Sequence, residues 1–144
     1  MLMKQIIIAI VITALSITGC GSNNSRPSDL PQLYPCVLTV TQEGNPLSGA
    51  YVTLIPMEES NAKYQASSVT DNEGKATIIT YGFDGVPAGK YKVCVRKVVG
   101  DENREYQLVE PKYSDSKNTP HELEITGKQM PPASFDVGKS VKPK

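Results

Sequence analysis

Between residues 37 and 137, apolar side chains recur at every second position in about seven short runs. A period of two gives a β-strand one apolar face, whereas an amphipathic helix needs a period of 3.6. Half-apolar strands must be covered by a second sheet. We therefore expect an all-β fold, a seven-stranded antiparallel β-sandwich. The residues expected to face its core are Leu38, Val40, Ala50, Val52, Leu54, Ala76, Ile78, Tyr91, Val93, Val95, Leu123, Ile125, Phe135 and Val137.

Turn-forming residues separate the runs. The sequence Glu-Gly-Asn-Pro at 43–46 is expected to close a hairpin, and the sequence Asp-Asn-Glu-Gly at 71–74 predicts a turn that ends in a left-handed glycine. The side chains of residues 71–73 could also offer oxygen ligands to calcium. The spacing of an EF-hand is absent, however, and the turn alone explains these residues.

The N-terminus has a different character. Lys4 precedes an apolar run from Ile6 to Ile12, and mostly small residues lead on to Cys20. This order is typical of a secretory signal peptide. A transmembrane helix would need about 20 mostly apolar residues, and Gly19 and Gly21 interrupt the run. We expect residues 1–19 to be a cleaved signal peptide.

The end of that run, Ile17-Thr18-Gly19-Cys20, resembles the lipobox of bacterial lipoproteins. The resemblance implies a diacylglycerol thioether on Cys20, cleavage just before it, and acylation of the new amine. Acyl chains contribute about 0.8 kcal/mol per buried CH₂, so two or more hold a protein durably at a membrane. Gly21 stands where proteobacteria read Asp as an inner-membrane signal. In an organism with two membranes, this favours the outer one.

Composition suggests the domain organisation. Residues 20–35 are polar and proline-rich and are expected to be a lipidated flexible tether, followed by one domain at 36–137 and a basic disordered tail at 138–144. Loss of Lys4 with the signal peptide lowers the 15 basic residues to 14, against 15 acidic ones. Nucleic-acid binding requires a concentrated basic face, so we do not expect it.

Two cysteines, Cys36 and Cys94, lie in the expected domain. In an exported protein they could form a disulfide, because disulfides persist in oxidising compartments. Strand parity argues for the alternative of two free thiols. Cys36 shares the inward parity of Leu38, while Cys94 alternates with Val93 and should face outward.

Residues 98–121 break the alternating pattern. A connection of this length in a compact domain is usually functional or disordered. Tyr106 and Tyr113 are candidate contacts for a ligand or partner, because aromatic rings stack on sugars and anchor protein interfaces. Alternatively, Tyr113 folds back and fixes this connection to the domain.

A further resemblance covers residues 36–137. It is carried by Gly44-Asn45-Pro46-Leu47-Ser48-Gly49-Ala50, Thr70-Asp71-Asn72-Glu73-Gly74, Pro87-Ala88-Gly89-Lys90-Tyr91-Lys92-Val93 and Glu110-Pro111-Lys112-Tyr113-Ser114-Asp115. In this order they resemble carboxypeptidase regulatory-like (transthyretin-like) domains of bacterial envelope lipoproteins. The resemblance implies a transthyretin-like, immunoglobulin-like sandwich. It implies no activity, because the shared motifs are structural. Cys94 departs from the polar residue usual in the family.

The sequence shows no catalytic motif. It has one histidine, His121, expected in an exposed turn, so one chain cannot supply a site of several imidazoles. Glu58 and Glu59 are adjacent and are expected at a solvated hairpin tip. A Gly-x-Ser-x-Gly elbow, a Walker loop and a Cys-x-x-Cys pair are all missing. We expect no enzyme activity, cofactor or metal.

These features together predict a membrane-anchored lipoprotein of the cell envelope. We expect it to act as a non-catalytic structural or protein-interaction module, with an envelope protein as partner. The alternative is a module that binds a glycan or nutrient through residues 98–121.

The lipobox yields the first prediction. Cys20→Ser removes the thiol that accepts the lipid, so the precursor should stay uncleaved and carry no thioether lipid. Mass spectrometry of the membrane fraction measures both properties. Normal maturation of this variant would contradict the lipoprotein interpretation.

Overall fold

The computed structural model describes residues 25–128, 130 and 132–141 of the 144-residue chain. Strands are the dominant regular structure among these residues and helix is almost absent, which confirms the predicted all-β class. The two short helical turns are η1 (Glu59–Asn61) and α1 (Pro111–Ser114). The strands are β1 (Leu33–Tyr34), β2 (Val37–Gln42), β3 (Asn45–Pro46), β4 (Tyr51–Pro56), β5 (Ala66–Val69), β6 (Lys75–Thr77), β7 (Ile79–Thr80), β8 (Phe83–Asp84), β9 (Val86–Pro87), β10 (Gly89–Arg96), β11 (Val98–Asp101), β12 (Arg104–Gln107), β13 (Glu122–Ile125) and β14 (Ala133–Asp136).

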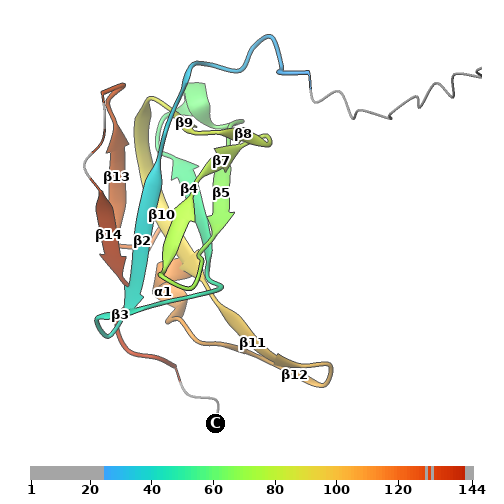
Figure 1. Cartoon of the computed structure of the whole chain (residues 1–144), viewed down its shortest axis with the longest axis vertical. Coiled ribbons are helices and arrows are strands. Elements are labelled where there is room, and N and C mark those ends of the chain that lie inside the picture. The colour runs from blue at the N-terminus through green and yellow to red at the C-terminus, as the bar shows by residue number, and fades with distance from the viewer. Residues whose placement is uncertain (1–24, 129, 131, 142–144) are drawn as a thin grey trace, which may run out of the picture.

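Two larger sheets contain most of these strands (Figure 1). The larger has the order β13-β10-β4-β5-β7-β8, and the other has the order β14-β2-β3 with β6 paired to β2. Buried side chains from both sheets form one hydrophobic core, an arrangement consistent with a β-sandwich. The two smaller sheets are the β1–β9 pair and the β11–β12 hairpin.

The core agrees closely with the alternating pattern. Every residue expected to face inward is buried, except Phe135, which is partly buried and packs against the core. Tyr91 is fully buried, and its hydroxyl donates a hydrogen bond to the carbonyl oxygen of Pro87 at 2.8 Å. That bond satisfies a polar group that would otherwise be costly to bury.

The pairing of β14 differs from the expected wholly antiparallel arrangement, because β14 runs parallel to β2. Strand β13 belongs to the six-stranded sheet and β14 to the other, so the connection between them changes sheets. Because this connection crosses between the sheets and does not form a hairpin, β14 can run in the same direction as β2. Alternation in sequence reports which face is buried, but not the direction of the neighbouring strand.

Residues 26–35, which we call the N-terminal segment, are not the flexible tether that their composition predicts. Leu30 is buried, and β1 pairs with β9. Arg26 donates to the carbonyl oxygen of Pro31 at 2.6 Å, and its guanidinium lies 5.9 Å from the centre of the Phe83 ring. A polar, proline-rich composition also suits a chain that lies on a surface, so composition alone could not reveal this packing.

The two ends of the predicted domain also extend differently from expectation. The Val141 backbone N–H donates to the carbonyl oxygen of Leu108 at 2.9 Å, so residues 138–141 of the predicted disordered tail are attached to the domain. Residues 98–107 form the projecting β11–β12 hairpin (Figure 1). Residues 108–120, which we call the covering segment, return to the domain and bury Val109 and Tyr113 in the core.

The predicted turn at 71–74 is present. The Asp71 carboxylate accepts hydrogen bonds from the backbone N–H groups of Glu73 and Lys75, at 2.8 and 2.9 Å. Gly74 has a left-handed φ of +75°, and a Cβ there would lie 2.5 Å from the carbonyl oxygen of Val40. The turn therefore packs directly on β2, and only glycine fits at this position.

Gly74→Ala should therefore lower the free energy of unfolding in two ways. Left-handed backbone costs an L-residue about 1–2 kcal/mol, and the new methyl group must push β2 away. Gly44→Ala is the matched control, because Gly44 has φ +79° and open space around a Cβ. We expect Gly74→Ala to cost at least twice as much in urea denaturation. Equal losses would show that the contact with β2 is unimportant.

Candidate functional site

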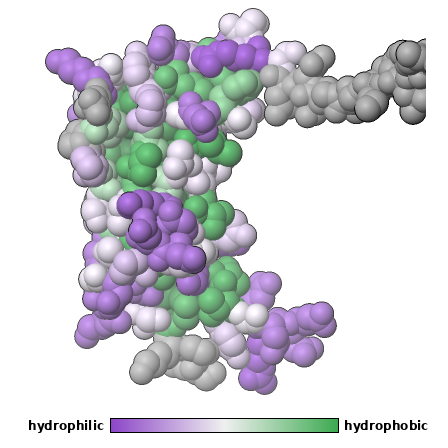
Figure 2. Space-filling model, in the orientation of Figure 1, coloured by the Kyte–Doolittle hydropathy of each residue, from purple (hydrophilic) through white to green (hydrophobic). Residues whose placement is uncertain are grey.

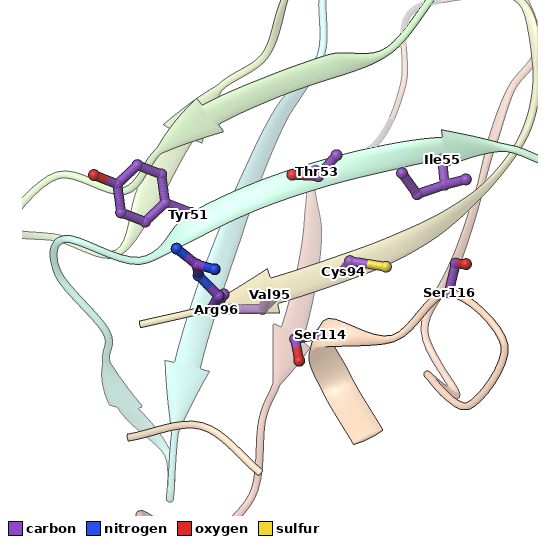
Figure 3. A pocket seen from close by; sticks show the side chains of 8 residues that line it. All are labelled: Tyr51, Thr53, Ile55, Cys94, Val95, Arg96, Ser114 and Ser116. Carbon is purple, nitrogen blue, oxygen red and sulfur yellow. The ribbon is translucent and has the colours of Figure 1, made fainter. Parts of the chain in front are cut away.

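A cleft of about 370 Å³ lies on the outer face of the six-stranded sheet, where β4 and β10 pass beside the covering segment. Strand alternation explains its floor: Val52 and Leu54 enter the core, so the intervening side chains of β4 point outward. Figure 3 shows the lining residues Tyr51, Thr53, Ile55, Cys94, Val95, Arg96, Ser114 and Ser116.

The covering segment forms one wall of the cleft. Thr119 is buried, and its hydroxyl donates to the carbonyl oxygen of Val93 at 2.8 Å, which ties the segment to β10. Asp115 organises the turn before Thr119, since its carbonyl oxygen accepts from the Thr119 N–H at 2.9 Å. These bonds place Ser114 and Ser116 opposite β10, as Figure 3 shows.

Tyr113 does not line the cleft. Its side chain is 8% exposed, and its ring stacks on His121 with centres 5.3 Å apart and planes at 18°. His121 also packs against Phe135, at 5.1 Å between ring centres. The interpretation of Tyr113 as a ligand contact is therefore replaced by the alternative that it folds back and fixes the covering segment.

His121 is partly buried in this aromatic stack rather than free in an exposed turn. Its Nε2 lies 2.8 Å from the carbonyl oxygen of Asp136. A carbonyl can only accept, so Nε2 carries the proton and donates it across to β14. The His121 ring therefore packs against Tyr113 and Phe135 and is hydrogen-bonded to the backbone of β14.

Tyr106, the other tyrosine expected to contact a ligand, lies apart from the cleft. It is on β12, opposite Val99 of β11, and is partly exposed. The structure thus separates Tyr106 from Tyr113.

Cys36 and Cys94 are both free thiols. Cys36 belongs to the core and Cys94 does not, although both are buried, so the faces predicted from parity are correct. Burial raises the pKa of Cys36 to about 11. Burial and the nearby charge of Asp115 raise the pKa of Cys94, and Lys92 opposes this rise. A nucleophilic cysteine needs a lowered pKa, so neither thiol is activated.

The outer face continues beyond the cleft as a row of uncovered side chains. Tyr51 stands opposite Val69, Thr53 opposite Ser67, and Ser67 opposite Ile79. Tyr51, Val69 and Ile79 are 55%, 49% and 39% exposed. We call these five residues the outer strip. The outer strip could have been found from the sequence, because apolar residues such as Tyr51 and Ile79 occupy strand positions that alternate with the buried ones.

Arg96 borders the outer strip. It pairs directly with Tyr51 across β10 and β4, and it is exposed. No carboxylate in the described part of the chain forms an ion pair with it. An apolar strip and an unpaired cation therefore lie side by side.

Several other expectations concern metals and membranes. Within residues 25–128, 130 and 132–141, no three His, Cys, Asp or Glu side chains gather as a metal site. No helix in those ranges is long and apolar enough to cross a bilayer.

Glu58 and Glu59 are exposed around the start of η1. Cys20 and the predicted signal peptide lie outside the described residues.

No protein-family model, curated protein or solved structure matches this chain. The resemblance to carboxypeptidase regulatory-like domains therefore rests on the sequence motifs alone.

The raised thiol pKa predicts a pH dependence. Between pH 9 and 11 the Cys36 thiol ionises in the unfolded chain but stays protonated in the folded one, because its pKa is raised from 9.0 to about 11. The folded state then binds more protons, so the free energy of unfolding falls as pH rises, by at most about 3 kcal/mol. Cys36→Ala should flatten this fall in urea titrations between pH 8.5 and 11. An unchanged slope would show that Cys36 is not protected by burial.

Proposed function

We propose that this chain is a lipoprotein of the bacterial cell envelope, held at a membrane through Cys20, whose domain is a non-catalytic structural or protein-interaction module. The outer strip carries the interaction part of the proposal. It is an uncovered sheet face with large apolar side chains, and exposed apolar patches with polar neighbours often mark protein contacts. The lipobox supports the anchor, and Gly21 favours the outer membrane in an organism that has one.

We further propose that the fold is the seven-stranded, transthyretin-like sandwich of carboxypeptidase regulatory-like domains. The positions of the shared motifs support this. The first begins at a hairpin turn in which Glu43 and Gly44 both have positive φ, at 53° and 79°. The second forms the 71–74 turn against β2. The third supplies Tyr91, the largest fully buried side chain of the core.

Two features support a non-catalytic role. Both described thiols have raised pKa values, and the imidazole of His121 is held between the Tyr113 and Phe135 rings with its Nε2 proton donated to a carbonyl. These groups have the chemistry of catalysts, but their surroundings hold them inactive.

The outer strip and Arg96 together define the partner's chemistry. Tyr51 and Val69 can pack on aliphatic or aromatic side chains, and Tyr and Arg are over-represented among residues that dominate binding energy. Arg96 favours a carboxylate, to which a guanidinium can donate two hydrogen bonds. We therefore expect a protein surface with apolar side chains beside an Asp or Glu.

Photo-cross-linking in cells tests this. A benzophenone amino acid replaces Val69 on the outer strip or, as the matched control, Val37. Val37 is 50% exposed on β2 in the other larger sheet, and Val69 is 49% exposed. We expect a discrete protein adduct from position 69 and none from 37. We also expect Arg96→Glu to reduce the adduct about tenfold, since it reverses the charge that borders the outer strip.

The same experiment can overturn the proposal. Equal adducts from both positions would indicate unspecific collisions. No protein adduct from position 69, or an adduct unaffected by Arg96→Glu, would remove the outer strip as an interface.

The cleft favours a second candidate function, the binding of a glycan or nutrient. Its volume of about 370 Å³ suits a small sugar, and Ser114 and Ser116 come from the 98–121 connection. The Tyr51 ring could stack on a pyranose and Arg96 could bind its hydroxyls. If this function holds, a glycan array should show selective binding that Tyr51→Ala removes. Val37→Ala, on the other larger sheet, should leave it intact. A blank array would leave protein interaction as the function.

A further inference from the structure

The N-terminal segment fixes where the anchored end of the chain leaves the domain. The Asp29 carboxylate pairs with Lys63, and the Tyr64 hydroxyl donates to the carbonyl oxygen of Asp29. Arg26 lies over the Phe83 ring. From residue 26 onward the chain is therefore tied to η1, β8 and their neighbours, at the upper end of the domain in Figure 1.

Covalent geometry limits how far Cys20 can be from this end. Arg26 is six positions after Cys20. A fully extended chain of that length spans at most about 20 Å, whatever its conformation. The opposite end is farther away, because residues 89–101 of β10 and β11 alone extend over about 40 Å. The β11–β12 hairpin at that far end is strongly hydrophilic, as its purple tip in Figure 2 shows.

The near end presents side chains that suit a bilayer surface. Tyr81, in the turn between β7 and β8, is 58% exposed, and Met57 beyond β4 is 48% exposed. The Tyr81 hydroxyl donates to the carbonyl oxygen of Lys63 at 3.0 Å, and its ring meets Tyr64 edge to face at 6.1 Å. Tyrosine is favoured at the headgroup level because its ring is apolar and its hydroxyl is polar.

We propose that this near end, formed by residues 26–31, 57–64 and 81–84, rests on the membrane that holds Cys20, with Tyr81 and Met57 among the lipid headgroups. The inference rests on the proposed lipid attachment and adds the orientation of the domain. Within these ranges the acidic side chains Asp29, Glu58, Glu59 and Asp84 outnumber the basic Arg26 and Lys63. Attraction to anionic lipid is therefore weak, and the contact depends on the acyl chains of Cys20.

The test uses the full lipidated chain in phosphatidylcholine vesicles that contain a lipid with a nitroxide on its headgroup. A fluorophore is attached to one introduced cysteine in a Cys94→Ser background, because Cys94 lines the cleft, whereas Cys36 is buried in the core and Cys20 carries lipid. Ala62→Cys places it on the near end, Asn103→Cys at the hairpin tip and Ser67→Cys on the outer strip. All three positions are exposed.

We expect at least threefold stronger nitroxide quenching at position 62 than at 67 or 103, unchanged between 0.1 and 0.5 M salt. Tyr81→Ala in the Ala62→Cys protein should reduce it. Quenching that is equal at the three positions, or strongest at 67 or 103, would overturn this orientation. A Cys20 peptide without lipid in the mass spectrum of the same sample would overturn the proposed function instead. Lipid present without quenching at 62 would overturn only the orientation.

Discussion

Strands β10 and β4 pair through six pairs of residues, and the remaining elements are positioned by the two faces of this pair. Val93, Val95, Val52 and Leu54 enter the core on one face, while Cys94, Arg96, Tyr51 and Thr53 lie on the other. Because side chains alternate strictly along a strand, a shift of the pairing by one residue would exchange the faces. The hydrophobic effect that stabilises the core therefore also determines which residues form the cleft and the outer strip.

The covering segment connects these two faces. Val109 and Tyr113 contribute to the core, and the same segment carries Ser114 and Ser116 to the wall of the cleft. Its attachment through Thr119 is a buried hydrogen bond to β10, which is costly to break without replacement. The shape of the cleft is thus maintained by contacts that belong to the interior, and it requires no ligand to form.

The sequence predicted the alternating core, the turns at 43–46 and 71–74 and the faces of both cysteines, because each depends on the order of neighbouring residues. It did not predict the packing of the N-terminal segment or the stack of Tyr113, His121 and Phe135. Those contacts join residues distant in sequence, and each depends on a single buried side chain such as Leu30. One isolated apolar residue gives no repeating pattern in the sequence. The parallel direction of β14 was missed because alternation is identical in parallel and antiparallel strands.

The packing of the N-terminal segment against the domain limits the directions from which an anchored domain could contact its partners. In the proposed lipidated form, the few residues between Cys20 and Arg26 would allow the domain little rotation away from the bilayer. When the near end rests on the bilayer, the strands of the six-stranded sheet run away from the membrane surface. The outer strip then faces parallel to the membrane plane. Encounters would then occur by lateral diffusion in the plane of the membrane. The best-matched partners would be proteins that expose an apolar, acidic surface at the same height above the lipid.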